Sequence, residues 1–176
     1  MPRLFRAAVD ALRLFDDPAL RRQARDVTVF DADLHRLVER LLRVQKRHHA
    51  VGVAASQIGD NRNVFTLDGG QFARGGKPMV FINAQVVSED GEMIEEEGCL
   101  SFPEIFIDVI RPRVVAITAI DREHKPIERE GTGLLARAFS HETDHLQGRL
   151  LIDRVAPDVR DTVINRMRRL VGKPRR

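Results

Sequence analysis

The segment SHETDHLQG, residues 140–148, constrains the fold more than any other part of the chain. Its two histidines are four residues apart, so in a helix they lie on one face, one turn from each other. The periodicity predicts a helix from about Gly133 to Gln147, ended by Gly148. Four residues spaced four, three and four positions apart lie along one face of this helix: Leu134, Ala138, His141 and His145. The histidines thus extend an apolar face, and the fold must bury this helix and supply partners for two imidazoles.

Two imidazoles one turn apart can direct their nitrogens at a single divalent metal ion. Glu142 lies about 100° further round the helix, where a carboxylate can reach a metal-bound water without ligating the metal. This is the position of a general base. The pattern also occurs by chance on charged helices, and in that case carboxylates such as Asp144 would satisfy the histidines without a metal.

A hydrolytic metal site needs a third protein ligand and keeps a fourth position open. Downstream of His145, the stretch LQGRLLIDRV offers only Asp153. Upstream, EEGCLSFP (96–103) contains the lone cysteine, Cys99, which a metal would deprotonate. A single cysteine excludes an internal disulfide, and the alternative to a ligand is a small buried hydrophobic side chain.

The composition is that of a globular protein: 176 residues, 43% hydrophobic and 31% charged. We expect one domain over residues 1–176. No apolar run approaches the ~18 residues of a membrane helix, and charged residues interrupt the N-terminal segment where a signal peptide would have its apolar core. We therefore expect no membrane association and a cytoplasmic location.

Secondary-structure signals alternate between helical and extended segments. An amphipathic helix is expected over Asp33–His48, capped by Asp31 or Asp33, and a loop or edge strand in AVGVAASQIGDN (50–61). The remaining expectations are strands at 63–68 and 78–87, two strands within 106–121 broken at Pro112, a hairpin turn at 121–126 and a helix over about 158–170. The predicted class is α+β with mostly antiparallel strands.

The C-terminus is basic. From position 160 onward one acid, Asp161, accompanies seven basic residues: Arg160, Arg166, Arg168, Arg169, Lys173, Arg175 and Arg176. Such a segment is either a solvated chain end or a contact with nucleic acid such as ribosomal RNA.

Three segments together carry a family resemblance. AVGVAASQIG (50–59), EGCLS (97–101) and HETDHLQG (141–148), about forty residues apart, are similar to the three signature motifs of peptide deformylase. The likeness extends from DDPALR (16–21) to LLIDRV (150–155). It implies strands packed around a central HExxH helix, a C-terminal helix, and one catalytic domain.

The resemblance implies an enzyme that removes the N-formyl group from the initiator methionine of nascent polypeptides and releases formate. It implies one metal ion per chain, held by Cys99, His141 and His145, with water in the fourth position. Glu142 would act as base and then as acid. The side-chain amide of Gln57 and the backbone N–H of Leu100 would form the oxyanion hole; the alternative for Gln57 is a surface loop. Family members commonly use Fe²⁺, and Zn²⁺, Ni²⁺ or Co²⁺ can occupy the site.

The substrate pocket and a supporting ion pair follow from the same resemblance. Val51, Leu134 and Ala138 would line an apolar pocket for methionine, although Leu134 can equally be a core residue. The small residues Gly52, Ala54 and Ala55 would let the backbone approach the reacting group closely. Outside the pocket, Glu97 would pair with Arg111 and hold the strand of Cys99, or the two would form an exposed pair that contributes only ~0–1 kcal/mol.

Two features depart from the family pattern. Ala50 stands where the first motif normally begins with glycine, at a cost of about 1 kcal/mol if its φ is positive. Ser56 replaces a more frequent proline or threonine. Two other functions stay open: a metallopeptidase, against which the cysteine ligand counts, and a metal-binding relative without turnover, against which Glu142 counts.

Overall fold

The computed structural model describes residues 12–171 and contains three α-helices in that range. These are α2 (Ala32–His48), α3 (Leu134–Leu146) and α4 (Pro157–Val171). Four short 3₁₀ helices connect other elements: η1 (Pro18–Arg21), η2 (Ala55–Ile58), η3 (Gly69–Gln71) and η4 (Leu151–Arg154).

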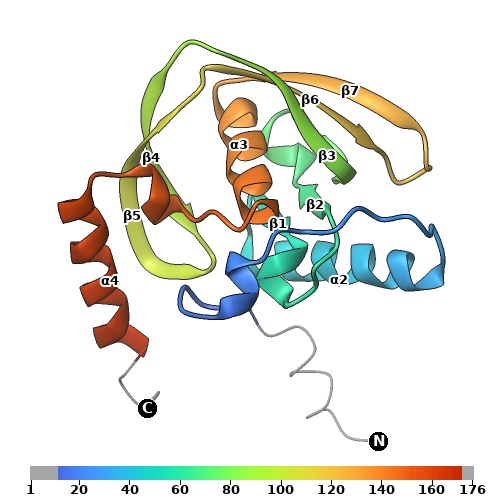
Figure 1. The fold of residues 1–176 in the computed structure, drawn as a ribbon. Coiled ribbons are helices and arrows are strands. Elements are labelled where there is room, and N and C mark those ends of the chain that lie inside the picture. The colour runs from blue at the N-terminus through green and yellow to red at the C-terminus, as the bar shows by residue number, and fades with distance from the viewer. Residues whose placement is uncertain (1–11, 172–176) are drawn as a thin grey trace, which may run out of the picture.

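Within residues 12–171, seven strands form two antiparallel sheets (Figure 1). The larger sheet has the order β1-β2-β3-β6-β7, with strands β1 (Gly52–Ala54), β2 (Val64–Leu67), β3 (Met79–Asp90), β6 (Val114–Ile120) and β7 (Pro126–Thr132). The smaller is a two-stranded ribbon of β4 (Met93–Cys99) and β5 (Phe102–Arg111). The predicted α+β class with antiparallel strands is confirmed.

Helix α3 lies in the middle of the molecule and contacts both sheets (Figure 1). One side packs on β1, β6 and β7 of the larger sheet, and the opposite side approaches β5 of the ribbon. Ala136, Phe139 and Leu146 join the apolar core of that sheet, where Phe81 packs edge-on against Phe139 at 5.4 Å between ring centroids. This central position holds the histidines between the two sheets.

The other two helices cover the outside. Helix α2 packs on β1 and β2, and Asp31 caps it by accepting hydrogen bonds from the backbone N–H groups of Asp33 (2.9 Å) and Leu34 (3.0 Å). The prediction of this helix and of its cap is confirmed. Helix α4 packs with η4 against β5, around Phe102, Ile105 and Met167.

Most extended segments lie where the sequence predicts them. The segment 50–61 contains edge strand β1 and then η2, the run 106–121 forms parts of β5 and β6 on either side of Pro112, and Asp121 closes the turn before β7. The sequence patterns do not predict β4. Its central residues, Glu95 and Glu96, are exposed and break the apolar alternation.

Part of the basic C-terminus lies outside the described residues, namely Lys173, Arg175 and Arg176. Within the described part, Arg166, Arg168 and Arg169 are exposed on α4. None of the described helices combines the length and apolar character needed to cross a membrane.

Candidate active site

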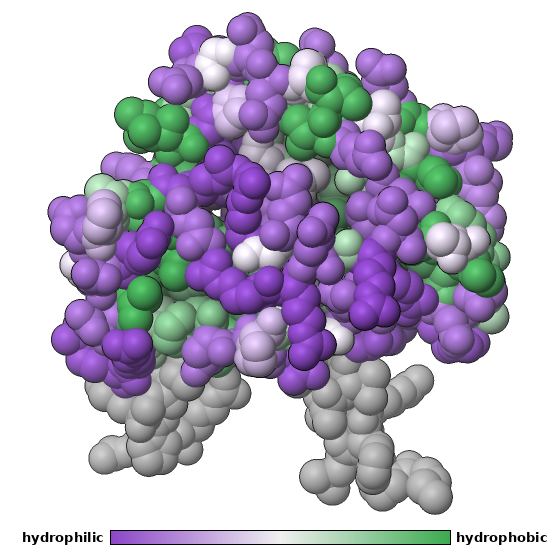
Figure 2. Space-filling model, viewed as in Figure 1, coloured by the Kyte–Doolittle hydropathy of each residue, from purple (hydrophilic) through white to green (hydrophobic). Residues whose placement is uncertain are grey.

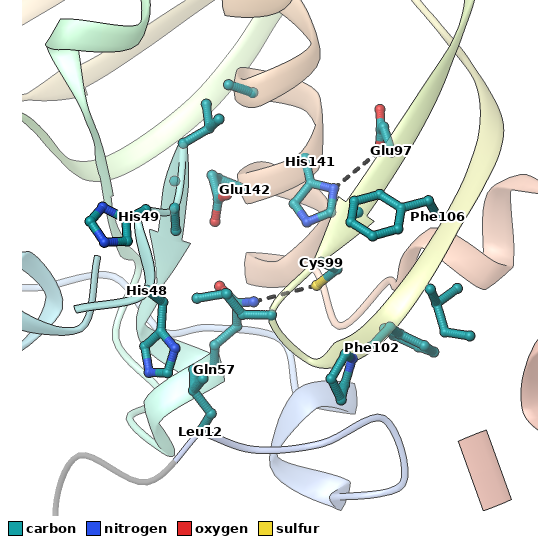
Figure 3. A pocket seen from close by; sticks show the side chains of 18 of the residues that line it. Leu12, His48, His49, Gln57, Glu97, Cys99, Phe102, Phe106, His141 and Glu142 are labelled. Atoms are coloured by element: carbon teal, nitrogen blue, oxygen red, sulfur yellow. Dashed lines mark hydrogen bonds and ion pairs between the residues drawn. The ribbon is translucent and has the colours of Figure 1, made fainter. Parts of the chain in front are cut away.

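The fold brings Cys99 to the two histidines of α3, which are more than forty residues away in the sequence. Figure 3 shows Cys99 beside His141. Cys99 ends β4, and His141 and His145 lie one turn apart on α3. One ligand atom from each of these residues lies within 4.8 Å of the other two, and the Cys99 Sγ is 3.3 Å from His145 Nε2. A register shift between β4 and β5 at Gly98 and Cys99 sets the position of the thiol.

These three donors fit a divalent metal ion. A thiolate and two imidazoles suit tetrahedral coordination with one open position. Glu97 Oε2 lies 3.1 Å from His141 Nδ1, which leaves Nε2 of that ring to face the site. Of the carboxylates that could satisfy the histidines, Asp144 does not take this role, because it accepts hydrogen bonds from Arg111 and Arg154; Glu97 is the carboxylate that pairs with His141.

Glu142 is buried beside these donors, and its Oε2 has no hydrogen-bond partner among the described residues. Burial raises the pKa of its carboxyl group to about 7, although the neighbouring His141 charge acts in the opposite direction. Gly52 of β1 makes this position possible, because a Cβ added there would lie 2.4 Å from Glu142 Oε1. The carboxyl group therefore borders the backbone of the edge strand.

Gln57 is held in one orientation inside the protein. Its side-chain oxygen accepts a hydrogen bond from the backbone N–H of Ala54 (2.9 Å), and its Nε2 lies 3.5 Å from Cys99 Sγ and 3.3 Å from Ser101 Oγ. With 1% exposure it is not a surface-loop residue, so that alternative is wrong. The amide donor thus faces the proposed ligands, and Leu100, directly after Cys99, lines the same cavity.

Glu97 and Arg111 form the predicted ion pair, at 2.8 and 3.0 Å, and both are buried. The alternative of an exposed pair is therefore wrong. Burial opposes ionisation of Glu97, but hydrogen bonds from His141 and Arg111 outweigh it and lower its pKa to about 2. Asp144 is also buried, yet the hydrogen bond from Arg154 and the charge of Arg111 keep its pKa below the usual value.

Sequence reasoning did not identify this role of Asp144 or the participation of Arg154. Arg111 donates to Asp144 at 2.5 Å, and Arg154 holds the same carboxylate through Nε at 2.9 Å. The sequence itself offers only an acidic residue between the two histidines. Nothing in the sequence indicates that η4 brings Arg154 to it.

The site opens into a cavity of about 910 Å³. All four residues assigned to the substrate line it: Val51, Gly52, Leu134 and Ala138. Leu134 is 41% exposed, so its interpretation as a core residue is wrong. Of the helix face that Leu134 shares with the histidines, Leu134, Ala138 and His141 line the cavity, and His145 is buried beneath it. Ala136, Phe139 and Leu146 pack in the core, which Ala138 also joins.

Alanine in place of glycine at position 50 does not strain the backbone. Ala50 does not have a positive φ; the preceding residue, His49, does, at 51°. His49 is the left-handed C-cap of α2 and donates its N–H to the carbonyl of Lys46. Ser56 is buried, with its hydroxyl 3.4 Å from the carbonyl oxygen of His145.

The family model for polypeptide deformylase matches residues 9–161. The chain belongs to the peptide deformylase family. A peptide deformylase of Thermotoga maritima is 39% identical over 147 residues, covering 83% of this chain and 87% of the relative. One of Rhizobium meliloti is 38% identical over 159 residues, covering 90% and 91%.

Solved peptide deformylases have the same fold as this chain. The crystal structure of the Legionella pneumophila deformylase superposes with a TM-score of 0.85 at 33% identity, covering 93% of this chain and 98% of the other. The Thermotoga maritima deformylase gives a TM-score of 0.77 at 38% identity, covering 83% and 97%. These peptide deformylases thus resemble this chain in both sequence and fold.

Proposed function

We propose that this chain is a metal-dependent hydrolase that removes the formyl group from N-formylmethionyl nascent peptides. The observation that carries the proposal is the meeting of Cys99, His141 and His145 beside Glu142. Glu142 is buried and lines the cavity, and its Oε2 has no hydrogen-bond partner among the described residues. Family membership supports the same reaction. We propose further that residues 1–176 act as one catalytic domain in the cytoplasm.

A divalent cation bound by Cys99, His141 and His145 would lower the pKa of water enough to supply hydroxide near neutral pH. The proposed cation is one Fe²⁺ per chain, with Zn²⁺, Ni²⁺ or Co²⁺ as substitutes. A soft thiolate beside two imidazoles is compatible with each of them. Glu97 and Arg111 are the proposed positioning pair, which orients His141 and holds the strand of Cys99.

Glu142 is the proposed proton carrier. It takes a proton from the attacking water and returns it to the methionine nitrogen when the C–N bond breaks, so that formate and a free amine leave. A base works best when its pKa lies near the working pH. The raised pKa of the Glu142 carboxyl is consistent with such a role.

Gln57 and Leu100 are the proposed oxyanion donors. Negative charge develops on the formyl oxygen as water adds, and each preorganised N–H there contributes about 3–4 kcal/mol. The bond between Gln57 Oε1 and the Ala54 N–H supports this role for Gln57, because it fixes which end of the amide faces the cavity.

The methionine side chain is proposed to occupy the cavity between Val51, Leu134 and Ala138, with Gly52 beside the formyl group. The formyl carbon carries only hydrogen, so a close wall would admit it and reject larger acyl groups. The exposed Arg166, Arg168 and Arg169 of α4 are proposed to contact ribosomal RNA, an interaction that weakens with added salt.

The test is a formate-release assay on a formyl-Met peptide after anaerobic purification and metal analysis. The wild type is expected to release formate, and Glu142→Gln to retain its metal while losing about 10²–10⁴-fold in rate. Equal rates would remove Glu142 as the base. Cleavage of unformylated peptides without formate would indicate a peptidase, and bound metal without turnover would indicate a binding protein.

A further inference from the structure

We propose that residues 12–15 form a strap that holds the two oxyanion donors, Gln57 and Leu100, in position relative to each other. This inference rests on the proposed function. Gln57 lies in η2, which connects two strands of the larger sheet, whereas Leu100 lies between the two strands of the ribbon. Within the part of the chain that the structure describes, no strand of one sheet pairs with a strand of the other. The distance between the two donors is therefore set by other contacts.

Two backbone hydrogen bonds join the strap to both donor segments. The Arg13 N–H donates to the carbonyl oxygen of Gln57 at 2.8 Å, and the Phe15 N–H donates to the carbonyl oxygen of Ser101 at 3.0 Å. Ser101 directly follows Leu100, and its hydroxyl lies 3.3 Å from Gln57 Nε2. The strap therefore connects the backbone of one donor to the residue beside the other.

Apolar side chains hold the strap in place. Leu12 packs against the core cluster around α2 and β1, and Phe15 packs against the cluster of β5, η4 and α4, with 5.9 Å between its ring centroid and that of Phe102. Polar side chains predominate on the face of the molecule in Figure 2, whereas three of the four strap residues are apolar and all four are half-buried. Figure 3 shows Leu12 at the same end of the cavity as Gln57. Burial of these apolar side chains orders the strap before a substrate binds.

The side chain of Arg13 has a smaller part in this contact than its backbone. It pairs with Asp17 at 3.5 Å and is 42% exposed, and exposed ion pairs contribute little to stability. Its Nε lies over Gly59, the C-cap of η2, where an added Cβ would approach it to 2.7 Å. A change that removes only this side chain therefore leaves the hydrogen bond to Gln57 in place.

The position of an oxyanion donor affects the transition state more than the bound substrate. The formyl oxygen becomes negative only as water adds, so misplaced donors lower kcat and leave KM nearly unchanged. Removal of one donor from an oxyanion hole reduces kcat about 10²–10³-fold. Loss of the strap displaces a donor without removing it, so we expect a smaller loss of about tenfold.

The test removes the Arg13 N–H and measures formate release from a formyl-Met peptide. Arg13→Pro lacks this N–H, and lactic acid at position 13 lacks it without the proline ring, because an ester replaces the amide. Each is expected to lower kcat about tenfold, with KM and metal content within about twofold of the wild type. Arg13→Ala differs from the lactic acid variant only in keeping the N–H, and it should lose less than about twofold.

Val29→Pro is the matched control for the proline. Val29 is 63% exposed in the loop before α2, and its N–H donates to none of the described residues. This variant should keep the wild-type kcat.

A double-mutant cycle separates positioning from a general effect on the fold. Because the Arg13 N–H acts through Gln57, adding Arg13→Pro to Gln57→Ala should lower kcat less than about threefold. A loss of about tenfold in both backgrounds, or wild-type kcat in the lactic acid variant, would overturn the inference. Both of these outcomes leave formate release by the wild type intact, whereas its absence would overturn the proposed function as well.

Discussion

The position of Glu142 depends on the absence of a single carbon atom from β1. The carboxyl group sits where Gly52 has no side chain, and its Oε2 finds no partner among the described residues. A buried polar atom without a hydrogen-bond partner lowers the stability of the fold. We therefore interpret Glu142 Oε2 as an atom kept free to bind water or substrate. We expect small changes at Gly52 to alter the reaction more than the fold.

Gly52→Ala is expected to lower kcat for formate release by about tenfold to a hundredfold, because displacement of a reacting group by about 1 Å has effects of this size. The added Cβ would lie 2.4 Å from Glu142 Oε1 and 2.7 Å from Leu67 Cδ2, so the carboxyl group must move. Metal content should not change. Gly70→Ala is the control. The atom nearest to a Cβ added there is Asp68 Oδ1, at 3.2 Å, so this substitution does not displace Glu142. Wild-type kcat in Gly52→Ala would contradict this account of the base.

Individual elements differ in how far their sequences predict them. Helices α2 and α3 follow apolar residues at helical spacing, and a capping aspartate or a closing glycine marks one end of each. Strand β4 offers no such pattern, because the β4–β5 ribbon exposes Glu95 and Glu96. The pattern of α3 left one question open: Leu134 shares one helix face with the histidines, which does not decide between core and pocket, and the structure places it in the cavity lining.

The cap of α2 gives a prediction about stability. Asp31→Ala should lower the free energy of unfolding by about 1 kcal/mol, because the N–H groups of Asp33 and Leu34 lose their acceptor. Urea unfolding measures the change. Asp33→Ala, in the first turn with its side chain 68% exposed, should cost less than half as much. If both variants are equally stable, Asp31 is not an effective cap.

At the scale of the whole molecule, a buried charge cluster connects the parts that carry the proposed ligands. Arg111 of β5 binds Glu97 of β4 and Asp144 of α3, and Arg154 of η4 binds Asp144. The sequence predicts the pair of Glu97 and Arg111 only through the family resemblance. The extension to Asp144 and Arg154 depends on how the ribbon, α3 and η4 pack together, which no local pattern records.

Arg111→Ala should lower the free energy of unfolding by about 3–5 kcal/mol, because it leaves two buried carboxylates without their shared partner. Metal content and formate release should fall with it, since Glu97 also orients His141. Arg122→Ala removes an exposed pair with Glu39 and should cost only about 0–1 kcal/mol. An Arg111→Ala protein with unchanged stability, metal content and activity would remove the positioning role of the cluster.

The most direct measurement is X-ray absorption spectroscopy on the chain loaded with one equivalent of zinc, together with Cys99→Ser. The wild type should show one sulfur at about 2.3 Å and two imidazole nitrogens at about 2.0–2.1 Å, and the sulfur contribution should be missing from the variant. A wild-type spectrum with only nitrogen and oxygen neighbours would contradict the account, because Cys99 would then not share an ion with His141 and His145.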